Sequence, residues 1–242
     1  MADRKVKLPK LPKREPAVLD EGAVAAVFEA AKGTRLYPFV VIAASSGCRR
    51  GELLALRWDD INFQTGQMKI SKSLEQTRAG LRVKSTKSGK PRPVDLEEFD
   101  LDVLSTHRQQ QEQDKINFGS DYRDNGLVFC QPNGDFYSPD HVGTRTKMLL
   151  RRAGYPQLCL HSLRHSHASI LLSHGVPIPV VSERLGHANP NITLGIYSHA
   201  LPADRKAASK AWHTALADVI GKEGLRKSAQ NLGTSRKLAV NE

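Results

Sequence analysis

The sequence predicts an α+β fold that is mainly α-helical and contains a small three-stranded antiparallel sheet. Apolar residues recur at helical spacing over most of the chain, and only residues 61–94 show the two-residue period of strands. The chain has 242 residues, 39% of them apolar, so it can bury a sizeable core. No apolar run reaches the roughly 18 residues of a membrane span, and we expect no membrane partner.

The charge balance points to a polyanionic partner. Lysine and arginine number 36 against 25 acidic residues, which gives a net charge of +11. Such an excess is most often found in proteins that bind nucleic acid. Residues 1–16 carry six basic residues and three prolines, as an extended linker or arm does. We expect one folded domain over 17–220 and a basic, disordered tail over 221–242.

Export signals are missing from the sequence. The N-terminal residues lack the apolar segment of a secretory signal, and three cysteines are too few and too scattered for a disulfide framework. We therefore expect a reducing, cytoplasmic setting.

Helices are expected on both sides of the strand region. Asp20 can cap a first helix, which Gly33 ends, and a second helix covers 36–46. Gly47 breaks the chain, and a third helix covers 50–58. After the strands, apolar spacing and the Ser138-Pro139 start signal predict helices over 96–117, 138–152, 162–174, 179–185, 192–197 and 204–220.

Three short strands are expected between the third and fourth helices. Apolar and polar residues alternate over 68–71 and 81–84, and Val94 lies in a third short run. Turns that contain glycine separate these runs, and the last hairpin turn, residues 87–90, is strongly basic. A further short strand or extended segment covers 127–129.

Two arginines stand at predicted helix starts. Arg49 follows a turn that contains glycine, and Arg164 lies three residues after His161, on the same helix face. Guanidinium forks near helix N-termini suit a phosphate, since each fork offers two parallel donors. The alternative is that both arginines form structural ion pairs with residues such as Glu52 or Glu183.

The C-terminal third of the sequence is rich in histidine. His161 and His165 have the i, i+4 spacing of some zinc ligands. No glutamate lies between them and Arg164 disfavours a nearby cation, so we expect no metal. Packing in the core is the alternative role for His165, His167 and His174.

Four short motifs of the sequence contain these residues. They are Ser46-Gly47-Cys48-Arg49-Arg50-Gly51-Glu52-Leu53, His161-Ser162-Leu163-Arg164-His165, Leu185-Gly186-His187 and Ile196-Tyr197-Ser198-His199. The basic turn Thr86-Lys87-Ser88-Gly89-Lys90 lies between the first two. In their order and separation, these motifs resemble those of the catalytic domain of the tyrosine recombinase (phage integrase) family, and the resemblance covers about residues 17–220. Ser46 departs from the threonine that is usual there.

The resemblance implies a metal-free reaction without a cofactor. Tyr197, which taken alone would be a packed aromatic, would attack the scissile phosphate and form a 3′-phosphotyrosine. Arg49 and Arg164 would clamp the non-bridging oxygens of that phosphate. Glu52 would orient Arg49 without touching the DNA.

The resemblance also implies three groups that handle protons or bind the phosphate. Lys87 would protonate the leaving 5′-oxygen, with Lys90 as a rival. Lys87 is preferred because it precedes Ser-Gly, as in the family's hairpin. His161 would assist proton removal from Tyr197, and His187 would hydrogen-bond the phosphate.

The family's partners follow from its reaction, which is site-specific integration or excision of a phage or mobile element in the cytoplasm of a bacterial host. The implied substrate is double-stranded DNA at a core recombination site, bound by a homotetramer, with accessory DNA-bending or excision factors. The isolated domain would be monomeric, and the helix over 204–220 would pack either on a neighbouring protomer or on its own domain. Family members carry a helical DNA-binding domain before the catalytic domain, and residues 1–16 resemble the linker that follows it.

Three other functions compete with this one. A type IB topoisomerase shares the set of arginine, lysine, histidine and tyrosine residues, although the Leu-Gly-His motif favours the integrase branch. A non-catalytic DNA-binding module would not need Tyr197 or Lys87. A metal-dependent hydrolase would use the histidines and would be sensitive to a chelator.

Overall fold

The computed structural model describes residues 17–87, 89–198 and 210–215. The chain divides into two units, Met1–Leu201 and Pro202–Glu242. In the second unit, residues 210–215 are helical, within the helix expected over 204–220. The expected arm, the expected tail and the rest of that helix lie outside the described residues.

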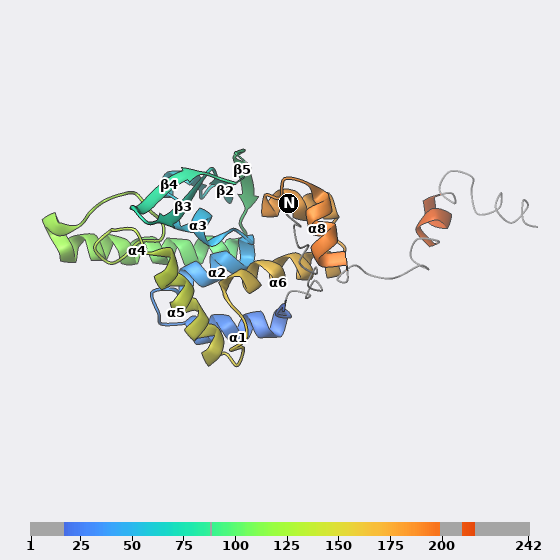
Figure 1. Cartoon of the computed structure of the whole chain (residues 1–242), viewed down its shortest axis with the longest axis horizontal. Helices are drawn as coiled ribbons and strands as arrows, with labels where there is room; N and C mark the ends of the chain where they lie inside the picture. Colours follow the sequence, from blue (N-terminus) through green and yellow to red (C-terminus); the bar gives the residue numbers. More distant parts are fainter. Residues whose placement is uncertain (1–16, 88, 199–209, 216–242) are drawn as a thin grey trace, which may run out of the picture. The chain divides into compact units, whose positions relative to one another are not determined.

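The first unit is mainly helical, and the predicted fold class is confirmed (Figure 1). Its α-helices are α1 Glu21–Ala31, α2 Tyr37–Ser46, α3 Arg50–Leu54, α4 Glu98–Phe118, α5 Pro139–Arg152, α6 Leu160–Ser173, α7 Ile178–Leu185 and α8 Pro190–Tyr197. Two start signals hold: the Asp20 carboxylate accepts a hydrogen bond from the amide of Ala23 (2.7 Å), and Ser138 caps α5.

One helix is shorter than expected. Helix α3 ends at Leu54, whereas the apolar spacing predicts a helix to residue 58. The chain leaves the helix because Leu56 O accepts a hydrogen bond from the amide of Val128 (2.9 Å) and the amide of Trp58 donates to Gly126 (3.0 Å). The expected extended segment at 127–129 therefore pairs with the chain just after α3.

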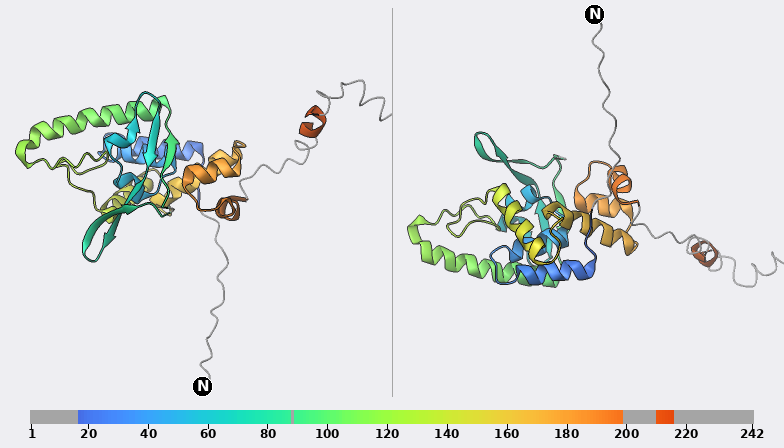
Figure 2. Two further views of the ribbon diagram at one scale, coloured as in Figure 1. Left: turned by 90° about the horizontal axis from the view of Figure 1, so that it is seen from above. Right: turned by 60° about the horizontal axis from the view of Figure 1, so that its bottom comes forward.

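The strands form two sheets, so the expectation of a single sheet is corrected. Strands β1 (Ile61–Asn62), β2 (Gln67–Ile70) and β5 (Arg92–Asp95) form an antiparallel sheet in the order β1-β2-β5. Strands β3 (Lys72–Thr77) and β4 (Gly80–Ser85) form a separate hairpin, which projects from the rest of the unit in both views of Figure 2. Lys87 and Lys90 thus lie between strands of two different sheets and not in a hairpin turn.

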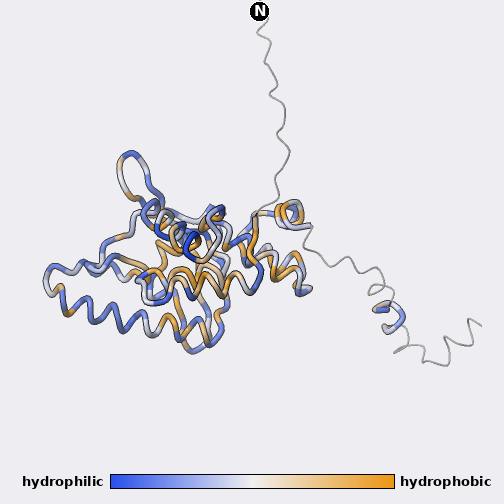
Figure 3. Tube along the Cα trace, turned by 90° about the horizontal axis from the view of Figure 1, so that it is seen from below, coloured by the Kyte–Doolittle hydropathy of each residue, from blue (hydrophilic) through white to orange (hydrophobic). Residues whose placement is uncertain are grey.

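Two apolar clusters hold the first unit together. The larger is formed by α1 to α5, the start of α6 and the three-stranded sheet, with α2 buried on nearly all sides. The smaller joins the end of α6 to α7 and α8, and Tyr197 belongs to it. Figure 3 shows the hydrophobic stretches where these helices pack and mainly hydrophilic ones on the projecting hairpin. Helix α6 belongs to both clusters, and the candidate site lies along it.

Candidate active site

The turn between α2 and α3 positions the first arginine. Gly47 ends α2 with a φ of 63°, in the left-handed region that favours glycine. A Cβ at Gly47 would lie 2.6 Å from Cδ2 of His167, so the turn also needs a residue without a side chain. The turn makes Arg49 the N-cap residue of α3. The position of Arg49 is therefore set by the backbone.

Glu52 joins two arginines. Its Oε1 accepts from Nη1 of Arg49 (2.9 Å), and its Oε2 accepts from Nη2 of Arg92 (2.7 Å). The backbone amide of Arg49 also donates to Oε2 (3.0 Å). The Glu52 residue is only 2% exposed, and burial alone would raise its pKa. The hydrogen bonds and charges of the two arginines outweigh burial and lower the pKa of this carboxyl, so Glu52 is ionised.

Arg92 is a part of the site that the sequence analysis missed. It is buried on β5, where its Nε donates to the carbonyl of Arg184 on α7 (2.9 Å). Burial opposes its charge, but the hydrogen bonds and the charge of Glu52 raise the pKa of Arg92 above the ordinary value. The one available signal is its place on the buried face of a short strand, where an arginine needs an acidic partner. Arg92 therefore links the sheet to α3 and α7.

Arg164 has no such acidic partner among the described residues. It is 3% exposed on α6, and its Nη1 donates to the carbonyl of Gly47 (2.7 Å). Its Nη2 is buried, and no described residue accepts a hydrogen bond from it. Burial and the nearby charge of Arg49 lower the pKa of Arg164 to about 10. Arg49 makes the ion pair of the structural alternative, but Arg164 is a buried cation with an unused donor.

Tyr197 ends α8 with its hydroxyl directed at a histidine. The residue is 1% exposed, and its Oη lies 2.6 Å from Nδ1 of His165. Burial raises the pKa of Tyr197 to about 12, and the charge of Arg164 opposes this rise. Burial, His161 and Arg164 lower the pKa of His165 to about 4. Both groups are therefore neutral near pH 7, so the tyrosine hydroxyl donates and the imidazole accepts.

The other two predicted histidines border the same arginines. The rings of His161 and His165 meet edge to face, with centroids 4.5 Å apart. Nδ1 of His187 lies 2.7 Å from Oγ1 of the buried Thr193. Burial, then Arg164 and Arg49, lower the pKa of His187 to about 4. This histidine is neutral, and a hydroxyl proton from Thr193 would leave its Nε2–H free to donate.

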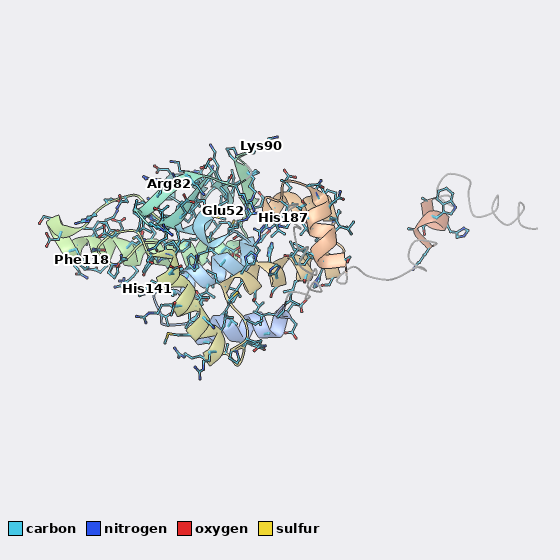
Figure 4. The ribbon with its side chains drawn as sticks, viewed as in Figure 1. Glu52, Arg82, Lys90, Phe118, His141 and His187 are labelled. Carbon is cyan, nitrogen blue, oxygen red and sulfur yellow. The ribbon has the colours of Figure 1, made fainter. Side chains whose placement is uncertain are left out.

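The structure brings together five of the six predicted catalytic residues. Hydrogen bonds from guanidinium groups to backbone carbonyls join the sequence motifs. Arg164 donates to the carbonyl of Gly47, and Nη2 of Arg49 donates to the carbonyl of Gly186 (3.2 Å). Figure 4 labels Glu52 and His187, which border this site, and Lys90 on the basic loop. Lys87, the sixth of these residues, is exposed on that loop. The residues that the sequence analysis missed are Arg92, His165 and Thr193.

Gly186 provides a direct test of the packing around Arg92. It ends α7 with a φ of 66°, and a Cβ there would lie 2.7 Å from Nη1 of Arg92. Gly186→Ala should lower the free energy of unfolding by about 3 kcal/mol, because it adds backbone strain and displaces a paired cation. The matched control is Gly175→Ala, at a φ of 80° with no neighbour within 4 Å.

Urea unfolding of the two variants separates the strain from the contact. The control should lose only about 1 kcal/mol, the cost of the left-handed conformation. Equal losses in the two variants would mean that Arg92 moves aside without cost, and that its contact with Glu52 is not a fixed part of the fold.

Within residues 17–87, 89–198 and 210–215, no three His, Cys, Asp or Glu side chains converge as a metal site requires. No helix in these ranges has both the length and the apolar character that crossing a membrane requires.

Sequence relatives are known. The family model described as "Phage integrase family" matches residues 18–204. A tyrosine recombinase XerC-like protein from Caldanaerobacter subterraneus subsp. tengcongensis is 31% identical over 222 residues, which are 85% of this chain and 57% of the relative. The ICEBs1 integrase of Bacillus subtilis is 27% identical, over 69% of this chain and 46% of its own length. The chain thus spans about half the length of these curated relatives.

Solved structures show the same fold. The XerA recombinase aligns with 84% of this chain and 66% of its own, with a TM-score of 0.63 and 25% identity. The Tn1549 transposon integrase, solved in complex with transposon right end DNA, gives a TM-score of 0.69 at 19% identity, over 85% of this chain and 67% of its own. Because the family model spans the motifs that contain the two arginines, the histidines and Tyr197, this chain belongs to the phage integrase family.

Proposed function

We propose that this chain carries the catalytic part of a site-specific recombinase, which cleaves and rejoins DNA through a 3′-phosphotyrosine. The observation that carries the proposal is the buried Nη2 of Arg164, which has no acceptor among the described residues although Arg49 and Tyr197 are close to it. A buried, unpaired guanidinium is costly, so such a site is expected to serve an anion that enters it. A DNA phosphate is that anion, in agreement with the names of the relatives.

The arginines act on the phosphate. Arg164 offers Nη2, and Arg49 is held in place by Glu52, which keeps its guanidinium fixed. Both donate to the non-bridging oxygens and stabilise the charge that grows there in the transition state. His187 donates a further hydrogen bond to the phosphate. Because these donors are already positioned, little reorganisation is needed when DNA binds.

The bond changes involve Tyr197 and the leaving oxygen. Oη of Tyr197 forms a bond to phosphorus while the bond from phosphorus to the 5′-oxygen breaks, which leaves the 3′-phosphate on the tyrosine. Lys87, or its rival Lys90, gives a proton to the 5′-oxygen. His161 assists removal of the tyrosine proton, and its ring contacts that of His165, whose Nδ1 lies 2.6 Å from Oη of Tyr197. Rejoining reverses these steps, so the reaction needs neither cofactor nor metal.

The charged surface suits double-stranded DNA at a core recombination site. Exposed basic residues lie on the projecting hairpin and on α5: Lys72, Arg78, Lys84, Arg145, Lys147 and Arg151. Contacts of this kind go mainly to phosphates and make binding salt-dependent. We also propose that the protein acts as a homotetramer on DNA in the cytoplasm of a bacterial host, with accessory DNA-bending or excision factors, to integrate or excise a phage or mobile element.

The test is covalent trapping on nicked DNA in the presence of EDTA. The nick lets the cleaved strand diffuse away, so the protein stays attached to the 3′ end and is seen on a denaturing gel. The DNA carries the core site of the parent element, or a random-sequence pool if that site is unknown. Wild-type protein should form the adduct, and Tyr197→Phe should form none, because it lacks the nucleophilic oxygen. Tyr155→Phe, a change to a half-buried tyrosine outside the site, should behave as wild type.

The same gel separates the competing functions. Salt-sensitive binding without an adduct would favour a DNA-binding module. Loss of the adduct in EDTA would favour a metal-dependent enzyme. A topoisomerase would form the adduct but would relax supercoiled DNA without exchanging strands between two sites, so recombination of a two-site plasmid by the full-length protein is the second readout.

A further inference from the structure

His165 is the residue that contacts the nucleophile. Its Nδ1 lies 2.6 Å from Oη of Tyr197, a short hydrogen bond between a half-buried histidine and a buried tyrosine. The two residues come from α6 and α8, two helices that the small apolar cluster around Tyr197 joins. The ring of His161 meets that of His165 edge to face, whereas the hydrogen bond of the tyrosine hydroxyl is to His165.

The protonation states fix the direction of this hydrogen bond. Tyr197 keeps its proton, since burial disfavours the phenolate, and His165 is neutral for the same reason. The hydroxyl therefore donates to a free lone pair on Nδ1, and Nε2 carries the ring proton. This is the arrangement that proton removal requires, because a base must lie within hydrogen-bond reach of the proton it takes.

We propose that His165 accepts the proton of Tyr197 as the tyrosine attacks phosphorus, and returns it when the strands are rejoined. This inference rests on the proposed function and deepens it. The O–H bond breaks as Nδ1–H forms, and the electron pair of Oη makes the new bond to phosphorus. The electron pair of the bond between phosphorus and the 5′-oxygen stays on that oxygen, which takes its proton from the lysine. The product state holds an imidazolium at His165, and His161 supports it from the adjacent position.

The charges around His165 make this step depend on the substrate. His161 and Arg164 face it from its own helix, and Tyr197 faces it from α8. Beyond them are His187 and the cations of α3 and β5, of which Arg49 and Arg92 share the single carboxylate of Glu52. In the free protein, an extra proton on His165 would add to an unbalanced positive charge. A bound phosphate supplies negative charge next to Arg164, so we expect His165 to become a competent base only when DNA is bound.

Substitutions at His165 separate proton transfer from positioning. His165→Asn keeps an acceptor oxygen near the place of Nδ1 but cannot take a proton at neutral pH. His165→Ala removes the side chain and leaves room for a small base. Both should slow adduct formation by about 100-fold or more, the usual contribution of a general base, with unchanged DNA binding. Free imidazole should partly restore His165→Ala and leave His165→Asn slow. His174→Ala, an exposed position near the end of α6, is the matched control.

A second substrate isolates the nucleophile's proton from that of the leaving group. DNA with sulfur in place of the bridging 5′-oxygen releases a thiolate, which needs no general acid. The defect of Lys87→Ala should shrink on this DNA, while that of His165→Ala should persist. A defect of His165→Ala that the sulfur relieves equally would overturn the assignment.

Other outcomes of the same experiment are equally decisive. Near wild-type rates for His165→Asn would reduce His165 to a positioning residue, and faster cleavage by His165→Ala would make the hydrogen bond an inhibitory latch. Either result overturns the proposal while the wild-type adduct still supports the proposed function. If the wild type forms no adduct on its cognate site, both proposals fail together.

Discussion

Replacing Arg164 with methionine should slow adduct formation by about 100- to 1000-fold without lowering the melting temperature. The loss of rate follows because one of the two groups that stabilise the transition-state charge is gone. Stability should hold because burial and the nearby charge of Arg49 lower the pKa of Arg164 to about 10, a drop that corresponds to about 3 kcal/mol against the charged form in the folded protein. This cost is present at every pH below about 10, where the arginine is charged in both states. Methionine keeps the long apolar stem of the side chain and removes the cost of burying the charge.

The matched control for this prediction is a paired arginine. Arg35 binds Asp114 through two hydrogen bonds of 2.6 and 3.0 Å, and the Asp114 side chain is only 7% exposed. Arg35→Met should therefore lower the melting temperature and leave cleavage unchanged at temperatures where the protein is folded. The two substitutions have opposite effects on stability and activity, as measured by thermal unfolding and the trapping gel. A large drop in melting temperature for Arg164→Met would show that its charge is well compensated in the free protein.

The sequence could predict features of the fold that depend on near neighbours. Asp20 and Ser138 mark helix starts because a cap acts on amides two or three residues away. Strand pairing depends on distant partners and was predicted incorrectly. The alternating run at 81–84 pairs with residues 72–77, which show little alternation and therefore gave no strand signal. The end of α3 depended in the same way on a segment about 70 residues later in the chain.

The candidate site divides along the same line. The motifs that contain Arg49, Arg164 and Tyr197 could be predicted, because residue types and their order are enough to define them. Arg92 could not, because its partner Glu52 lies 40 residues earlier and only the fold brings them together. His165 was assigned to the core, and its contact with a tyrosine 32 residues later depends on how α6 and α8 pack. Arg92 and His165 share one cause: each is defined by a partner that is distant in the sequence and that only the fold brings close.

Glu52→Gln should lower the free energy of unfolding by about 3–5 kcal/mol at pH 7. The amide keeps the shape of the side chain but removes the one charge that Arg92 pairs with in its buried position, and its NH₂ group meets guanidinium donors. Urea unfolding measures the change. The matched control is Glu75→Gln, on the projecting hairpin, where the carboxylate binds Arg82 and Lys84 in contact with water. Screened surface pairs contribute little, so this control should keep nearly wild-type stability.

The pH dependence of Glu52→Gln gives the sign of the effect. The folded pKa of Glu52 is lowered, so its ionisation stabilises the fold above the ordinary carboxyl pKa, and that contribution is lost as the pH falls through the folded value. The gap between wild type and variant should therefore be largest near neutral pH and shrink in acid. Adduct formation should fall as well, since Arg49 loses the carboxylate that orients it. A gap that stays constant into acid would mean that the variant loses packing, and that the charge on Glu52 does not hold the two arginines.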